Sequence, residues 1–175
     1  MKNSFCLLLC GLFLTLNAVA AESSFRADLL NALQIYAKEN NQGLNKPSNN
    51  FVGFSIKSEP TENLITIYHA DSTIDIVMNG YICDSSGCAL KFQEPRCFYY
   101  TPGGKHSALA IYDAAFNQLE NYSKGPVDEL KFWQLGADVY GRISSYDENQ
   151  TELFSCHAHQ ESLVCASTST TPDEP

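Results

Sequence analysis

Residues 51–93 have the sequence FVGFSIKSEPTENLITIYHADSTIDIVMNGYICDSSGCALKFQ. This stretch contains four runs rich in β-branched and aromatic side chains, at residues 51–57, 64–69, 73–83 and 88–93. Short polar segments of the kind found in turns separate the runs. Connections this short join antiparallel neighbours, because a parallel pair needs a crossover of a dozen or more residues. The stretch therefore predicts an antiparallel meander.

Amphipathic helices are expected on both sides of this meander. Ser24 can cap the first helix, which should end near residues 41–43, and Ser107 can cap the second, which Gly125-Pro126 should stop. The apolar residues at helical spacing are Phe25, Leu29, Leu30, Leu33, Tyr36 and Ala37 in the first helix, and Leu109, Tyr112, Phe116 and Leu119 in the second.

A second group of strands is predicted at residues 129–140, 143–146, 152–158 and 162–166. Helices with apolar stripes beside two sets of strands are typical of the α+β class. We predict a single α+β domain over residues 21–167, with a curved antiparallel sheet of about six to eight strands and both helices on its core face. The Ser/Thr-rich residues 168–175 are too polar to pack and are expected to form a disordered tail.

The first twenty residues have the pattern of a secretory signal peptide. Lys2 gives a short positive region, residues 6–16 are an almost unbroken apolar run, and Ala18-Val19-Ala20 is a small-x-small cleavage signal. The run is too short to span a bilayer comfortably, and no later segment is apolar for about eighteen consecutive residues. We expect a periplasmic or secreted protein, cleaved near Ala20, without a transmembrane segment.

The charge balance narrows the classes of partner. There are 20 Asp+Glu against 11 Lys+Arg, a formal net charge of −9. A nucleic-acid binder needs a basic stripe that displaces counterions from phosphates, so nucleic acid is excluded as an expected partner. A protein or a component of the cell envelope remains as the expected partner, and the oligomeric state is left open.

Hairpin register predicts how the cysteines pair. Cleavage near Ala20 leaves five of them: Cys83, Cys88, Cys97, Cys156 and Cys165. A turn centred between residues 160 and 161 sets Cys156 opposite Cys165, and disulfide geometry there requires a non-hydrogen-bonded pair. A turn centred between residues 85 and 86 sets Cys83 opposite Cys88. We predict both disulfides in clipped hairpins. The alternative at the second hairpin is that Cys97 pairs with Cys83 or Cys88.

Cys97 would be the unpaired thiol if both bridges form. Arg96 beside it favours a thiolate, and His106 nine residues later could act as its base. This pair defines an alternative function, a small secreted cysteine-dependent hydrolase or transferase. No cysteine-hydrolase signature surrounds Cys97, however, and a buried structural cysteine is the simpler interpretation.

Two other places suggest ligand binding. Gly104, Lys105 and His106 precede a helix start, where free N–H groups could hold a small anion, although the loop lacks the glycine and hydroxyl that a nucleotide phosphate loop needs. His157 and His159 alternate along a predicted strand and could both ligate a metal. No third ligand other than Glu161 lies near them, so neither a metal nor a cofactor is expected.

Aromatic residues recur on the predicted strands, and at period two about half of them must face away from a single core. They could form a recognition surface, or they could pack in a second layer. The residues concerned are Tyr81, Phe92, Phe98, Tyr99, Tyr100, Phe132, Trp133, Tyr140 and Tyr146.

The loop Cys83-Asp84-Ser85-Ser86-Gly87-Cys88, in an exported domain with an amphipathic first helix, resembles the periplasmic Ivy-type lysozyme inhibitors. Those proteins insert a disulfide-bounded C-x4-C loop into their target. The resemblance covers six residues and the order of the elements, and residues 84–87 lack the histidine of those inhibitors. It implies Asp84, Ser85, Ser86 and Gly87 as contact residues. The expected function is therefore that of a non-enzymatic binding or inhibitor-like protein.

Overall fold

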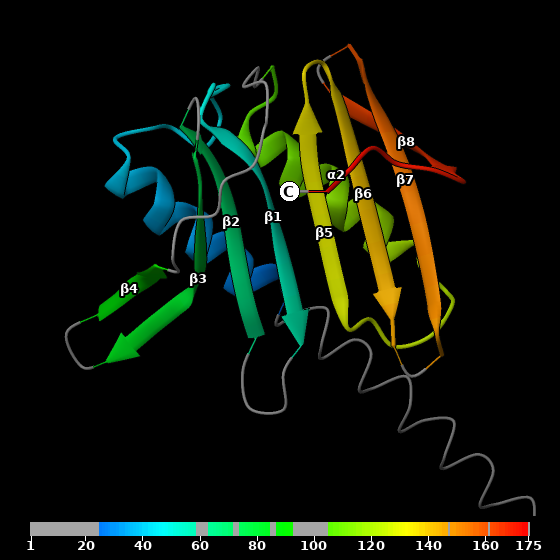
Figure 1. Cartoon of the computed structure of the whole chain (residues 1–175), viewed down its shortest axis with the longest axis horizontal. Helices are drawn as coiled ribbons and strands as arrows, with labels where there is room; N and C mark the ends of the chain where they lie inside the picture. The colour runs from blue at the N-terminus through cyan, green and yellow to red at the C-terminus, as the bar shows by residue number, and fades with distance from the viewer. Residues whose placement is uncertain are drawn as a thin grey trace, which may run out of the picture.

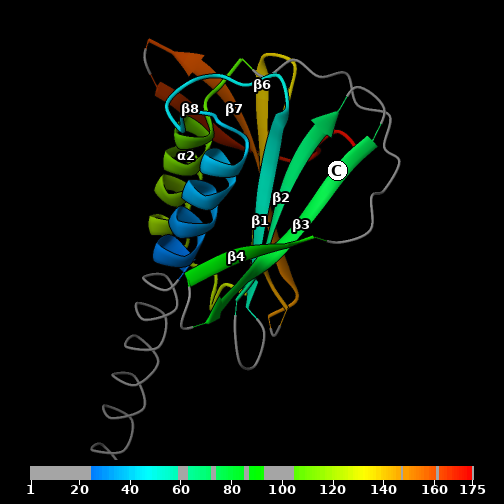
Figure 2. The same ribbon diagram turned by 90° about the vertical axis from the view of Figure 1, so that its left-hand side faces the viewer.

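The computed structural model describes residues 25–58, 63–71, 74–84, 87–92, 105–146, 148–160 and 162–174. Within these ranges the chain forms one eight-stranded antiparallel sheet and two helices. Figure 1 looks onto the sheet with the helices behind it, and Figure 2, turned by 90°, shows both helices on the same side. The prediction of a single α+β domain with both helices on one face of the sheet is confirmed.

The strands follow each other through the sheet in a simple order, β4-β3-β2-β1-β5-β6-β7-β8. The sheet is thus made of two four-stranded meanders that meet at β1 and β5. The elements are β1 (Phe51–Ser58), β2 (Asn63–Asp71), β3 (Ile74–Asp84), β4 (Gly87–Phe92), α2 (Ala108–Glu120), β5 (Glu129–Leu135), β6 (Asp138–Ser145), β7 (Gln150–His159) and β8 (Ser162–Thr168), preceded by a helix at residues 25–39.

The predicted strand at residues 129–140 is wrong, because the chain reverses inside it. Leu135 pairs with Asp138 across a two-residue turn, so β5 and β6 are neighbours in a tight hairpin. Gly136 adopts a φ of +65°, which favours glycine and suits the first position of such a turn. Strand-forming residues continue on both sides of this one glycine, so composition alone does not reveal the break.

The main core lies between the helices and one face of the sheet, which we call the inner face. Alternate strand residues point into it, such as Leu130 and Phe132 of β5, while Lys131 and Trp133 lie on the opposite, outer face. The helices bury the stripes expected of them: Phe25, Leu29, Leu33, Tyr36 and Ala37 in the first, and Tyr112, Phe116 and Leu119 in α2, with Leu30 and Leu109 partly buried.

Ser107 caps α2 as predicted. Its Oγ accepts a hydrogen bond from the backbone N–H of Ala110 at 3.1 Å. The helix ends at Glu120, earlier than the Gly125-Pro126 stop that was expected, with Asn121 as its C-cap.

The β7–β8 hairpin has the predicted register. Phe154 faces Ser167, Ala158 faces Leu163, and Cys156 faces Cys165. The two cysteines form a disulfide, and their Cα atoms lie 3.9 Å apart. That separation is close to the ~4.5 Å typical of a non-hydrogen-bonded pair and well below the ~5.5 Å of a hydrogen-bonded pair.

Candidate functional site

The β3–β4 hairpin carries the contact loop expected from sequence. Its register sets Cys83 opposite Cys88 and Asp84 opposite Gly87, which is the predicted alignment. Ser85, Ser86 and the bond between the two sulfurs lie outside the described part of the structure. The disulfide at this hairpin therefore stays a prediction, whereas the backbone alignment that it requires is present.

This hairpin extends beyond the rest of the sheet. β3 pairs with β2 only from Ile74 to Asn79, and within the described residues the following part of β3 pairs with β4 alone. The register shifts between Asn79 and Tyr81, a bulge that bends and twists the strand. Figure 1 shows the hairpin projecting from the edge of the sheet, and Figure 2 shows that β4 runs across the direction of β1 and β2.

His106 has a structural position before α2. Its ring Nε2 lies 2.8 Å from the carbonyl oxygen of Ala137, so Nε2 donates to that oxygen. Its backbone N–H donates to Oε1 of Gln134 at 3.2 Å. Cys97, the predicted nucleophile, lies outside the described residues, so the structure places only one member of the proposed pair.

The predicted anion site would use N–H groups at the start of α2. Lys105 is exposed there, and Gly104 lies outside the described residues. The N–H of Leu109 donates to Leu44, and those of Ala110 and Ile111 both donate to Ser107. An anion could not use these three donors without breaking those bonds, and anion binding stays a prediction.

His157 and His159 are exposed, as expected for alternate residues of β7. Nδ1 of His157 lies 3.1 Å from Oδ1 of Asp138 on the neighbouring strand β6. No group of three potential metal ligands occurs among the side chains that the structure describes.

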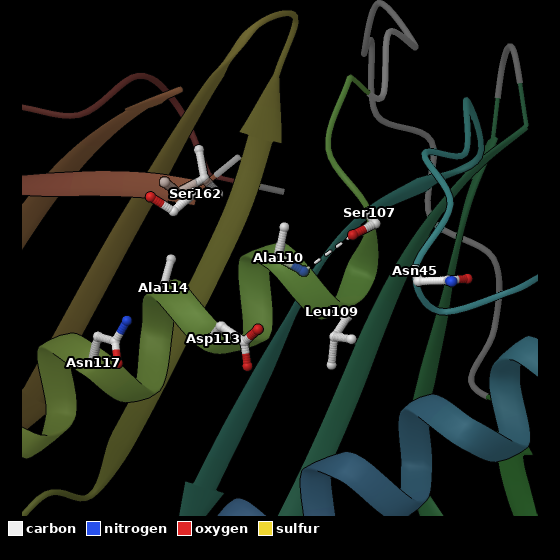
Figure 3. A pocket seen from close by; sticks show the side chains of 9 residues that line it. Asn45, Ser107, Leu109, Ala110, Asp113, Ala114, Asn117 and Ser162 are labelled. Carbon is white, nitrogen blue, oxygen red and sulfur yellow. Dashed lines mark hydrogen bonds between the residues drawn. The ribbon is translucent and has the colours of Figure 1, made fainter. Parts of the chain in front are cut away.

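A groove of about 240 Å³ lies between α2 and the start of β8 (Figure 3). Asp113 and Asn117 line it from α2 and Ser162 from β8, and all three side chains are exposed. Burial raises the pKa of Asp113, and the charge of Arg26 opposes that effect. Water reaches Asp113, Asn117 and Ser162 and would compete with a ligand for their polar groups.

A cluster on the outer face is the arrangement that sequence reasoning missed. Lys131 of β5 is only 5% exposed, and its Nζ lies 4.8 Å from the ring centre of Tyr68 and 5.8 Å from that of Trp133. A buried ammonium needs a counter-charge. Nζ finds one at 3.2 Å in the carboxylate of Glu174, from the segment that follows β8.

Arg142 of β6 stands opposite Lys131 in the β5–β6 register and shares the same carboxylate. Its NH1 lies 2.7 Å from Glu174, and its NH2 lies 2.9 Å from Glu129. Glu129 also accepts a hydrogen bond from the hydroxyl of Tyr146 at 2.7 Å. Burial, the bond to Glu129 and its charge raise the pKa of Tyr146 to about 12. We call Lys131, Arg142, Glu129 and Glu174 the outer-face cluster.

Residues 169–174, within the predicted disordered tail, carry Glu174 across this face. In Figure 1 the segment passes in front of β6 and β5, on the side away from the helices in Figure 2. Nearby, Trp133, Tyr68 and Val52 form a second buried cluster, as the packed-layer alternative for outward aromatics expects. Tyr146 is 53% exposed and does not belong to that layer.

Comparisons with known proteins give no match to any family model, curated protein or solved structure.

Proposed function

We propose that this protein is an exported, non-enzymatic binding protein that docks on a protein or cell-envelope partner through the tip of the β3–β4 hairpin. The observation that carries the proposal is the register of that hairpin, whose outer part leaves the sheet and sets Cys83 opposite Cys88. An isolated two-stranded hairpin is marginally stable in water. A disulfide at its tip would hold the loop in one shape and lower the entropy lost on docking.

One observation supports export. The Cys156–Cys165 disulfide suits an oxidising compartment, because thiols stay reduced in the cytosol. Among the residues that the structure describes, no helix is long and apolar enough to cross a membrane. Residues 1–20, the proposed signal peptide, lie outside the described residues.

Site-specific crosslinking tests the docking loop. A photo-crosslinking amino acid at position 86 should give a covalent adduct with the partner in the native source. The matched control carries the same probe at Val164, which is 54% exposed on β8 at the other edge of the sheet. The same adduct from both positions, or none from position 86, would contradict docking through the loop.

An intact mass of the protein from its native source tests export. We expect a chain that begins at Ala21 and lacks four hydrogens relative to the fully reduced form, two for each predicted disulfide. A chain that still begins at Met1 with every thiol reduced would overturn the proposal.

A further inference from the structure

We infer that the outer face around Lys131 and Arg142 is a binding site for an acidic peptide segment of a partner, and that Glu174 is its intramolecular occupant. This site lies on β5 and β6, apart from the β3–β4 hairpin, and the inference does not depend on the proposed function. Its ligand would present a glutamate carboxylate to both cations at once.

Two buried donors at this site have no acceptor among the residues that the structure describes. Arg142 gives two of its nitrogens to Glu129 and Glu174, while its Nε is buried and has no acceptor within the described ranges. The indole Nε1 of Trp133, next to Lys131 in β5, is also buried without an acceptor there. A peptide segment would bring carboxylate and carbonyl oxygens, which are the groups that such donors bind.

The cations are also pre-positioned. Lys131 is held against the rings of Tyr68 and Trp133, and Glu129 fixes one side of the guanidinium of Arg142. Groups that are already fixed lose little conformational freedom when a ligand arrives. A carboxylate between them receives charge-assisted hydrogen bonds from both, as Glu174 does.

Glu174 is suited to being exchanged. It belongs to residues 169–174, which form no helix or strand. Because this segment is tethered to β8, its carboxylate acts at an effective concentration in the millimolar range, so a partner must compete with it. Removing only that carboxylate should therefore open the site.

The single tryptophan gives a direct readout. We would titrate the full chain with the capped peptide Thr-Thr-Pro-Asp-Glu-Pro, the sequence of residues 170–175, and follow the fluorescence of Trp133. The Glu174→Gln variant should bind it at least ten-fold more tightly than the wild type, because the internal carboxylate no longer competes. Equal affinities would overturn the inference.

Four controls separate this site from general charge attraction. The peptide with Gln in place of Glu should bind Glu174→Gln at least ten-fold more weakly. Adding Arg142→Gln to Glu174→Gln should also abolish binding, whereas adding Lys124→Gln, which removes a cation paired with Glu152, should preserve it. Sodium acetate should cause no saturable change. If the two peptides bind Glu174→Gln equally, or acetate binds as well as the acidic peptide, the inference is wrong. These two comparisons do not use Arg142→Gln, so they hold even if that variant fails to fold.

Discussion

At the scale of single residues, Gln134 connects three parts of the molecule through its side-chain amide. It is 5% exposed, its Nε2 donates to the carbonyl of Phe51, and its Oε1 accepts from the N–H of His106. It thereby joins β5 to the start of β1 and to the loop before α2. Without the amide, the carbonyl of Phe51 and the N–H of His106 would both lose this hydrogen-bond partner.

We predict that Gln134→Met destabilises the protein by about 1–3 kcal/mol, the usual cost of leaving buried polar groups unsatisfied. Urea unfolding measures the change in the free energy of unfolding. The matched control is Gln150→Met, an exposed glutamine in β7, which should change it by less than about 0.5 kcal/mol. Equal small effects of both variants would show that the Gln134 amide contributes nothing.

Glu152 gives a pH dependence with a defined sign. The hydroxyl of Ser167 donates to it at 2.6 Å and Lys124 pairs with it at 3.1 Å, and these contacts lower its pKa while burial opposes them. A carboxyl whose pKa is lower in the folded state adds stability above the unfolded value of about 4.5, and that stability is lost as the pH falls through the folded value.

We therefore predict that Ser167→Ala raises the pKa of Glu152, measured by carboxyl NMR titration. Ser162→Ala should leave that pKa unchanged, because the Ser162 hydroxyl bonds to the carbonyl of His159 instead. If the two variants give the same pKa, Ser167 is not the cause of the shift.

Local residue roles could be predicted from sequence, and distant ones could not. Ser107 and the Cys156–Cys165 pair follow from spacing within one helix start and one hairpin. The outer-face cluster depends on two longer-range features. The turn at Gly136 sets Lys131 opposite Arg142. The carboxylate that pairs with Lys131 belongs to Glu174, 43 residues further along the chain. Composition predicts a disordered tail there because it does not register ion pairs between distant segments.

At the scale of elements, the β7–β8 disulfide is the covalent link that the structure describes between neighbouring strands. Its cysteines are 9 residues apart, and on the chain-entropy model a closed loop of that size contributes somewhat under ~3 kcal/mol. We predict that replacing both cysteines by alanine lowers the free energy of unfolding by that amount, measured in urea. Mild reduction should destabilise the wild type further than this variant, because it would also open the predicted Cys83–Cys88 disulfide. An unchanged midpoint in the variant would contradict the prediction.

The approach of β1 to β5 depends on a glycine. A Cβ atom at Gly53 would lie 2.2 Å from the carbonyl oxygen of Phe132 and 2.6 Å from the Cα of Trp133. Both are backbone atoms, so the strands themselves would have to separate. The register of β1 against β2 also shifts between Phe51 and Gly53.

We predict that Gly53→Ala destabilises the protein by about 3 kcal/mol, at the upper end of the usual cost of overpacking. Thermal unfolding measures it. In the control Gly43→Ala, the nearest atom to the new Cβ is the exposed side-chain oxygen of Asn45, which can move, so the loss should be under about 1 kcal/mol. A Gly53→Ala protein as stable as the control would exclude the predicted clash.

The strands of the first meander were predicted to within two residues, because polar turns bound each run. The second meander was predicted less well, since only Gly136 marks the turn between β5 and β6. Sequence also could not show that β1 and β5 join the meanders, because strand pairing across a long insertion leaves no local pattern.

At the scale of the whole molecule, one core holds the two meanders together. Phe54 and Ile67 of the first meander and Phe132 and Phe154 of the second belong to the same buried cluster, which both helices cover. We predict that unfolding in urea is a single transition, with the same midpoint by Trp133 fluorescence and by far-ultraviolet circular dichroism. Two separated midpoints would mean that the meanders unfold independently.

The order of the strands also has a consequence for how quickly the chain reaches its native state. Of the pairings between the described strands, six join strands consecutive in the chain, and one, between β1 and β5, joins residues as distant as Ile56 and Leu130. Local contacts form early and cheaply, whereas closing a long loop is slow. Joining the two meanders should therefore limit the rate, and substitutions along that seam should slow refolding more than equally destabilising ones within either hairpin.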